Sequence, residues 1–359
     1  LDDAPVYLDL RSGDDPRAAA HAIMRDDYSR PVDPTVDRTV VGRLFRVGDD
    51  EYLFYHRAHH LVLDGVAGKE YMTKTMEAYS AAVRGEALPA GGELDFALPH
   101  RADDEYRRSA RWTRDRDYWQ AQVGELPSPV TLAHHAGTPA AISHRVTGGV
   151  PHAVADLVHA AAEALNSSVP AIVAVASAAY IARATGAGDV TLSLPVAART
   201  TAVLRKTPLP VSNVLPIRTS VGPQVTAAQA LETTSAAMLD ALRHQRFRFG
   251  DLGAGLYRFR GPMLNIMLFE RDLTVGDASA TFHVLTTGPI DDLAFNLYSA
   301  EGDDGGWALD VEANPNRYTY AEAAEHRRQV IAMIGEFASA VVERSAGVVD
   351  DLPFAVEPV

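Results

Sequence analysis

Two adjacent histidines, followed by an aspartate and a glycine, form the pattern in this chain that is best suited to chemistry. They are His59, His60, Asp64 and Gly65, spelled His-His-x-x-x-Asp-Gly. A histidine titrates near neutral pH, so a loop that presents a neutral imidazole can supply a general base. Two plainer interpretations are a histidine packed within the fold and a zinc ligand beside a carboxylate. No second group of His, Cys or Asp residues stands out, so we expect no metal site.

The residues on either side of the histidines predict rigid elements that hold them. Tyr52–Ala58 is rich in aromatic strand formers, whereas Gly65–Val83 has a helical pattern with Gly85 as its C-cap. Gly65 lets the helix begin without a side chain at that point. The sequence therefore places His60 at a junction between a strand and a helix, where it can face a cleft.

Length and composition indicate a soluble globular protein. The chain has 359 residues, of which 47% are hydrophobic and 22% are charged. No apolar run approaches the ~20 residues of a membrane helix, so we expect no membrane segment. The lack of cysteine fits a cytoplasmic protein. The net charge of −14 argues against nucleic-acid partners. The absence of cysteine excludes disulfides, thiolate metal sites and a cysteine nucleophile.

Periodicity along the chain predicts alternating strands and helices, which is typical of an α/β fold. The expected strands cover residues 6–10, 38–47, 51–58, 142–146, 189–195, 211–219, 263–269, 281–285, 293–298 and 307–312. The expected helices cover residues 16–27, 65–83, 103–123, 151–166, 169–185, 226–243 and 320–343. The stretch 124–140 lacks periodicity and holds three prolines, so we place a domain boundary there.

The histidine pattern and several further segments together resemble the condensation domains of nonribosomal peptide synthetases, which belong to the chloramphenicol-acetyltransferase-like superfamily. The segments with family-like spelling are 106–119, 192–199, 211–218, 242–247 and 261–269. The resemblance extends over roughly residues 5 to 345. The opening segment of the family has no counterpart before Leu1, so we expect a domain that is incomplete at its start.

This resemblance implies a fold of two acetyltransferase-like lobes, arranged as a V around a central channel. Residues 1–128 would form the N-terminal lobe, which carries the histidine pattern, and residues 129–359 the C-terminal lobe. A segment at about 273–299 would cross back to the N-terminal lobe.

The resemblance also implies roles for individual residues. His60 would be the catalytic histidine, acting as a base or holding the attacking amine in place, and His59 would be packed within the fold. Asp64 would be structural and would pair with Arg199. In that arrangement Gly65, Asp64 and Arg199 support the loop and take no direct part in the chemistry.

Three further positions match segments that line the channel or the crossover in the family. Ser212 would hydrogen-bond a substrate or the developing oxyanion, or be an ordinary strand serine. Asn213 is its neighbour on the same strand. Asp292 would lie in the crossover, where we expect a structural role more often than a catalytic one.

The implied function is amide formation between a donor acyl or peptidyl thioester and an acceptor aminoacyl thioester, as in the biosynthesis of antibiotics or siderophores. Both substrates would arrive on phosphopantetheine arms of upstream and downstream peptidyl carrier domains, with an adjacent adenylation domain and no cofactor bound to this domain. The domain would be a monomer within a multidomain synthetase. The arginine-rich stretches 101–116 and 243–260 would offer a basic docking patch, or simply be solvated helix faces.

Two alternatives stay open. One is a stand-alone acyltransferase that uses a soluble alcohol, and the other is a non-catalytic condensation-like module that only docks partners. Docking modules typically lose the paired histidines, which are intact here. The residues after Gly65 loosely resemble the lipid-initiating subtype, so the donor is either a fatty acyl starter or a peptidyl group.

Overall fold

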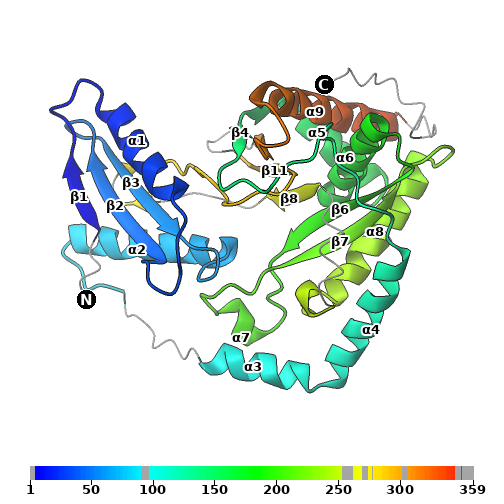
Figure 1. Ribbon diagram of the computed structural model, residues 1–359, viewed down its shortest axis with the longest axis horizontal. Coiled ribbons are helices and arrows are strands. Elements are labelled where there is room, and N and C mark those ends of the chain that lie inside the picture. The colour runs from blue at the N-terminus through cyan, green and yellow to red at the C-terminus, as the bar shows by residue number, and fades with distance from the viewer. Residues whose placement is uncertain are drawn as a thin grey trace.

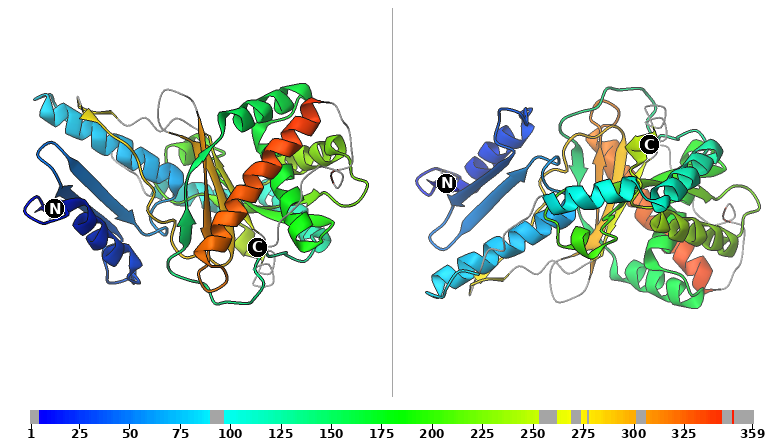
Figure 2. Two further views of the ribbon diagram at one scale, coloured as in Figure 1. Left: turned by 90° about the horizontal axis from the view of Figure 1, so that it is seen from above. Right: turned by 90° about the horizontal axis from the view of Figure 1, so that it is seen from below.

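The computed structural model describes residues 5–89, 97–252, 262–268, 274–276, 278–300, 306–343 and 349. Its helices and strands form a smaller and a larger unit, which lie side by side in Figure 1 and in both views of Figure 2. The class is mixed α/β, as the sequence predicts.

The smaller unit is built on a three-stranded sheet of β1 (Val6–Asp9), β2 (Val40–Arg46) and β3 (Tyr52–Ala58). β1 runs parallel to β2, and β2 pairs with β3 in an antiparallel hairpin. Helices α1 (Pro16–Ser29) and α2 (Gly65–Val83) complete the unit. Its core consists of apolar side chains from α1 and the hairpin, namely Ala20, Met24, Phe45, Val47 and Tyr55.

The larger unit is built on a second sheet with the strand order β4-β12-β11-β8-β6-β7, in which β5 also pairs with β12. β8 runs parallel to β6 and β11, and the remaining pairs are antiparallel. The strands are β4 (His144–Val146), β5 (Gly149–Val150), β6 (Asp189–Val196), β7 (Asn213–Ser220), β8 (Met263–Met267), β11 (Leu293–Ser299) and β12 (Trp307–Ala313).

Four helices pack against this sheet and share its core: α5 (His152–Ala164), α6 (Val169–Thr185), α8 (Ala227–Arg243) and α9 (Tyr320–Val342). Residues 171–182 of α6 are all buried, because α5, α8, α9 and the sheet surround that helix. No single helix among the described residues could cross a membrane. Only α5 and α6 together, bent by 111°, reach the length and apolar composition required.

The charged helix expected over 103–123 is two helices, α3 (Ala97–Arg107) and α4 (Ala110–Glu125). Ser109 separates them, because its hydroxyl caps α4 by accepting from the backbone N–H of Trp112 and donates to a carbonyl of α3. Both helices precede the boundary placed near residue 128, yet α4 packs on the larger unit. There the Trp119 side chain is 1% exposed and belongs to the main core.

The segment between β8 and β11 contacts both units. Its β9 (Thr274–Val275) lies against α2, and the Gly276 N–H donates to the Ser80 hydroxyl at 2.7 Å. Leu285 packs on the core of the smaller unit, whereas the carbonyl of Val284 accepts from Arg145 on β4. Positions 273 and 277 of the expected crossing segment lie outside the described residues.

The strand predicted over 281–285 is wrong, since these residues form no regular element. The prediction also missed a short helix, α7 (Ala202–Arg205), and a 3-10 turn, η1 (Phe249–Leu252).

Candidate functional site

The paired histidines occupy a tight turn between β3 and α2. His59 closes this turn: its backbone N–H donates to Thr39 at 2.7 Å, and its carbonyl accepts from Val62 at 2.9 Å. Its ring Nδ1 accepts from the backbone N–H of Leu61 at 3.0 Å. An accepting Nδ1 leaves the proton of a neutral ring on Nε2. His59 therefore stabilises the turn through both its backbone and its ring.

His60 has a different environment in the same turn. Its side chain is exposed, and within the described part of the chain it makes no hydrogen bond, ion pair or ring contact. His56, four residues earlier, lies on β3 with its ring stacked on Tyr71 at 4.7 Å between centroids, and burial lowers the pKa of His56. Of these two histidines, only His60 is open to an incoming molecule.

Asp64 ends the turn and connects it to the larger unit. The Asp64 residue is 3% exposed, and its Oδ1 caps α2 by accepting from the Ala67 N–H at 2.9 Å. Both of its oxygens accept from the Arg199 guanidinium, at 2.8 and 2.9 Å. Oδ2 also accepts from the backbone N–H groups of Val211 and Ser212, at 2.9 and 3.0 Å. Five donors therefore converge on one buried carboxylate.

Electrostatics keep this carboxylate ionised. Burial alone would raise the pKa of Asp64, but the hydrogen bonds from Arg199 and from the N–H groups of Ala67 and Val211 outweigh it. The pKa of Asp64 therefore lies below its usual value. None of its hydrogen bonds goes to His60, so Asp64 fixes the turn without acting as a direct partner of that imidazole.

Arg199 extends the same anchor into the loop before β7. Its Nη2 donates to the carbonyl of Leu209 at 3.0 Å, in addition to the pair with Asp64. Its side chain is 7% exposed, so this charge depends on Asp64 for compensation. The preceding Ala198 has a positive φ of 50°, which turns the chain sharply at this point.

The strand expected from residue 211 begins at Asn213, so Ser212 lies just before β7. These two residues present one exposed hydroxyl and one anchored amide. The Ser212 side chain is exposed next to the backbone that binds Asp64. The Asn213 amide donates to the carbonyls of Gln245 and Phe247, at 3.0 and 2.7 Å. Asn213 is thus committed to holding the segment after α8.

Asp292 lies elsewhere in the larger unit, at the end of the segment that contacts both units. Its Oδ1 accepts from the Tyr318 hydroxyl at 2.7 Å and the Thr131 hydroxyl at 2.8 Å, and it pairs with Arg317 at 3.2 Å. Asp292 is 9% exposed. Three internal partners therefore occupy this oxygen.

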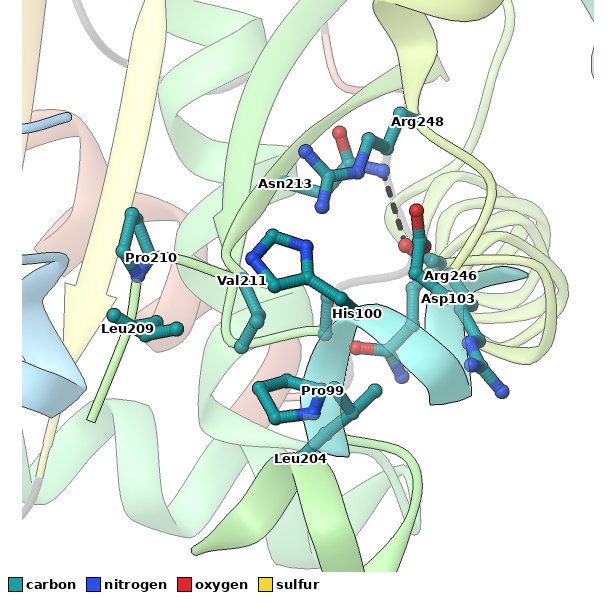
Figure 3. Close-up of a pocket in the computed structure, with 12 residues that line it drawn as sticks. Pro99, His100, Asp103, Leu204, Leu209, Pro210, Val211, Asn213, Arg246 and Arg248 are labelled. Carbon is teal, nitrogen blue, oxygen red and sulfur yellow. Dashed lines mark hydrogen bonds between the residues drawn. The ribbon is translucent and has the colours of Figure 1, made fainter. Parts of the chain in front are cut away.

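A cavity of about 100 Å³ adjoins the Asp64 anchor, between α3, the loop before β7 and the segment after α8 (Figure 3). Val211 and Asn213 form part of its wall, so the segment that binds Asp64 just before β7 also borders this space. The other lining residues are Pro99, His100, Asp103, Ala198, Leu204, Leu209, Pro210, Gln245, Arg246 and Arg248.

Sequence reasoning gave no role to a second polar cluster nearby. Asp115 on α4 binds His244 at the end of α8 and Tyr106 on α3. The His244-Gln245 spelling belongs to the family-like segments, but nothing in the local pattern pairs it with a residue 129 positions earlier. Among the described residues no three His, Cys, Asp or Glu side chains are grouped so as to hold a metal ion.

Comparisons with known proteins agree on one family. The family model described as "Condensation domain" matches residues 2–346. The chain is 34% identical over 347 residues to an isonitrile lipopeptide synthase from Streptomyces coeruleorubidus, a match that covers 94% of this chain and 23% of that protein. The chain therefore spans less than a quarter of the length of this curated relative.

Solved structures give the same answer for the fold. The first condensation domain of the calcium-dependent antibiotic synthetase, in complex with a substrate analogue, superimposes with a TM-score of 0.86 at 31% identity, covering 98% of this chain and 78% of that one. A mutant starter condensation domain of rhizomide synthetase, in complex with C8-CoA and Leu-SNAC, gives a TM-score of 0.86 at 29% identity, with 98% and 80% covered. Both resemblances extend over nearly the whole chain.

Proposed function

The chain belongs to the condensation-domain family of nonribosomal peptide synthetases, and on that premise we propose that His60 catalyses amide formation between two carrier-bound thioesters. The donor is an acyl or peptidyl thioester, and the acceptor is the amino group of an aminoacyl thioester. The acceptor nitrogen attacks the donor carbonyl carbon, a C–N bond forms, and the C–S bond breaks. The donor arm leaves as a thiol, and the amide stays on the acceptor arm.

The observation that carries this proposal is the contrast between His60 and its surroundings. Its imidazole is exposed and makes no bond among the described residues, while His59 and Asp64 fix the turn on both sides of it. A neutral imidazole carried on a fixed turn suits proton transfer from the attacking amine, or a hydrogen bond that holds the amine in place. Orientation of two bound substrates supplies much of the rate enhancement, because the attack becomes effectively intramolecular.

The neighbouring residues take supporting roles in this proposal. Asp64, with Arg199, holds the turn, and Gly65 begins α2 without a side chain. The exposed hydroxyl of Ser212 would donate to substrate or to the oxygen of the tetrahedral intermediate. Asn213 and Asp292 act through the fold, since their polar atoms bind internal groups.

We propose the partners that this chemistry requires. Peptidyl carrier domains deliver both thioesters on phosphopantetheine arms, and an adenylation domain loads the acceptor. The first relative is more than four times as long as the matched part, which leaves room in that protein for such domains. The domain itself needs no cofactor for this reaction.

A fatty acyl donor fits the names of two similar proteins. One relative is named as a lipopeptide synthase, and one solved starter domain contains C8-CoA. We therefore propose an acyl chain as donor in preference to a peptide.

The test is a single-turnover assay on the whole domain, with donor and acceptor loaded on separate carrier proteins. Amide product is followed by mass spectrometry for wild type, His60→Ala and the control His21→Ala, which removes an exposed histidine from α1. We expect a loss of about 100-fold or more for His60→Ala, and no loss for the control. A C8-acyl donor and a dipeptidyl donor, compared in parallel, test the donor class.

Three results would overturn the proposal. If His60→Ala forms as much product as wild type, His60 takes no part in the chemistry. If wild type forms no amide with either donor but still binds carriers, the domain is a docking module. If wild type forms product only when a soluble alcohol is offered as the acceptor, the domain is a stand-alone acyltransferase.

A further inference from the structure

The buried carboxylate of Asp115 on α4 connects α3, α4 and the end of α8, next to the segment that follows α8. Asp115 on α4 is 2% exposed, and its two oxygens have different partners. Oδ1 lies 2.8 Å from Nδ1 of His244, and Oδ2 accepts from the Tyr106 hydroxyl at 2.8 Å. Because a carboxylate only accepts, Nδ1 of His244 must carry a proton. The direction of both hydrogen bonds is therefore fixed.

His244 is held on its other sides as well. Its ring stacks on Tyr118 with centroids 4.1 Å apart and planes 13° apart. Its carbonyl accepts from the Trp119 indole N–H at 3.0 Å. The residue where α8 ends, and where the next segment begins, is consequently fixed by α4 from several directions.

This segment leads directly back to the histidine turn. The Asn213 amide binds the carbonyls of Gln245 and Phe247, and the N–H of the adjacent Ser212 binds Asp64 at 3.0 Å. Asp64 in turn ends the turn that carries His60. A continuous path of hydrogen bonds and short backbone links therefore runs from Asp115, through His244 and Asn213, to the proposed site.

We propose that Asp115 and His244 are positioning residues for amide formation, acting by keeping Asn213 and Ser212 in register with Asp64 and His60. The inference rests on the proposed function of His60. Neither residue takes part in the reaction, because both have internal partners. Their effect is geometric: directional bonds in a buried network hold the strand start more closely than apolar packing alone, and small displacements of a site are costly for catalysis.

Three substitutions of His244 separate a hydrogen-bonding role from a packing role. His244→Asn keeps an amide N–H that can donate to Asp115 but loses the ring. His244→Phe keeps the ring that stacks on Tyr118 but cannot donate, and His244→Ala loses both. The matched control is Asp117→Asn on the outer face of α4, where a carboxylate that is 57% exposed pairs with Arg116.

The readouts are the single-turnover rate at saturating acceptor, the acceptor concentration for half-maximal rate, and the melting temperature. We expect His244→Phe and His244→Ala to lose about 10- to 100-fold in rate, with the half-maximal concentration changed by less than about twofold. His244→Asn should stay within about threefold of wild type, and Asp117→Asn should match it.

The opposite ranking would overturn the inference: activity kept by His244→Phe and lost by His244→Asn would mean that only packing matters. A loss that follows the unfolded fraction at the assay temperature would overturn it as well. Should His244→Phe fail to fold, Tyr106→Phe takes its place, because it keeps the ring and removes one bond to Asp115. We expect a loss of about 3- to 10-fold from that variant, and wild-type rate from it would refute positioning.

Failure of the inference and failure of the proposed function give different results. If His60→Ala abolishes amide formation while every His244 variant keeps the wild-type rate, only the positioning role is lost. If wild type forms no amide, or His60→Ala remains active, the proposed function is lost and the inference with it.

Discussion

Replacing Asp64 by asparagine should destabilise the protein more than any change at an exposed carboxylate. Asparagine has the same shape, but it offers one acceptor oxygen where the carboxylate offers two. In either orientation of the amide, at least two of the five converging donors would face an NH₂ group instead of an oxygen. Among these donors is Arg199, whose side chain is only 7% exposed.

The expected magnitude follows from this geometry. Removing one partner of a buried ion pair leaves an uncompensated charge, which costs about 3 to 5 kcal/mol. That is a large share of the ~5 to 15 kcal/mol by which a typical domain is stable. The pKa of Asp64 is lowered in the folded protein, so its contribution is present above the unfolded pKa of about 4 and is lost as the pH falls through the folded pKa.

Urea denaturation at pH 7, followed by far-ultraviolet circular dichroism, measures this loss. Glu70→Gln is the matched control, because Glu70 pairs with Lys74 on the same helix in an ion pair that is more than half exposed, and we expect a change below about 0.5 kcal/mol. The double variant Asp64→Asn/Arg199→Met should cost less than the sum of its single changes, since no lone charge remains. A loss below about 1 kcal/mol for Asp64→Asn would refute the view of Asp64 as the anchor of the turn.

Three further predictions concern the larger unit. Burial lowers the pKa of His326, whose Nδ1 lies 2.6 Å from the Tyr180 hydroxyl, to about 4. The free energy of unfolding should therefore fall by up to about 3 kcal/mol as the pH drops from about 6.5 to about 4, and denaturation series at several pH values should show a flatter slope for His326→Gln. Phe295→Ala should cost about 3 to 5 kcal/mol in urea denaturation, because its side chain is fully buried on a central strand. Arg145→Met should lower the free energy of unfolding by about 3 to 5 kcal/mol, because it leaves the fully buried Asp310 carboxylate without Arg145. A loss no greater than at an exposed arginine would contradict this.

Local patterns in the sequence predicted most of the helices and strands. The helices Gly65–Val83 and Val169–Thr185 have the predicted bounds, because each has a clear cap and one uninterrupted pattern. The helix expected over 103–123 failed at Ser109, where a side-chain cap interrupts a run of charged residues that otherwise looks continuous. The residues 281–285 alternate like a strand, but the carbonyl of Val284 binds the Arg145 side chain in place of a neighbouring strand.

The site was predictable only as far as short spacing and family resemblance extend. The paired histidines and the Asp64–Arg199 ion pair follow from such patterns. The hydrogen bonds from the N–H groups of Val211 and Ser212 to Asp64 join positions almost 150 residues apart. Backbone donors cannot be predicted from residue types, because nearly every residue has one. The contact between Asp115 and His244 also joins distant positions. Taken alone, each of the two looks like an ordinary polar residue of its own helix.

The order of the larger sheet has a consequence for synthesis of the chain. β4 pairs with β12, and α6 packs on α9, so elements near residue 150 find their partners only near residue 320. At about 5 to 20 residues per second, the apolar α6 waits roughly 10 to 30 s on the ribosome before α9 can cover it. During that interval the apolar side of α6 that packs on α9 stays uncovered. Chains that stop before α9 should therefore aggregate instead of folding into a smaller stable unit.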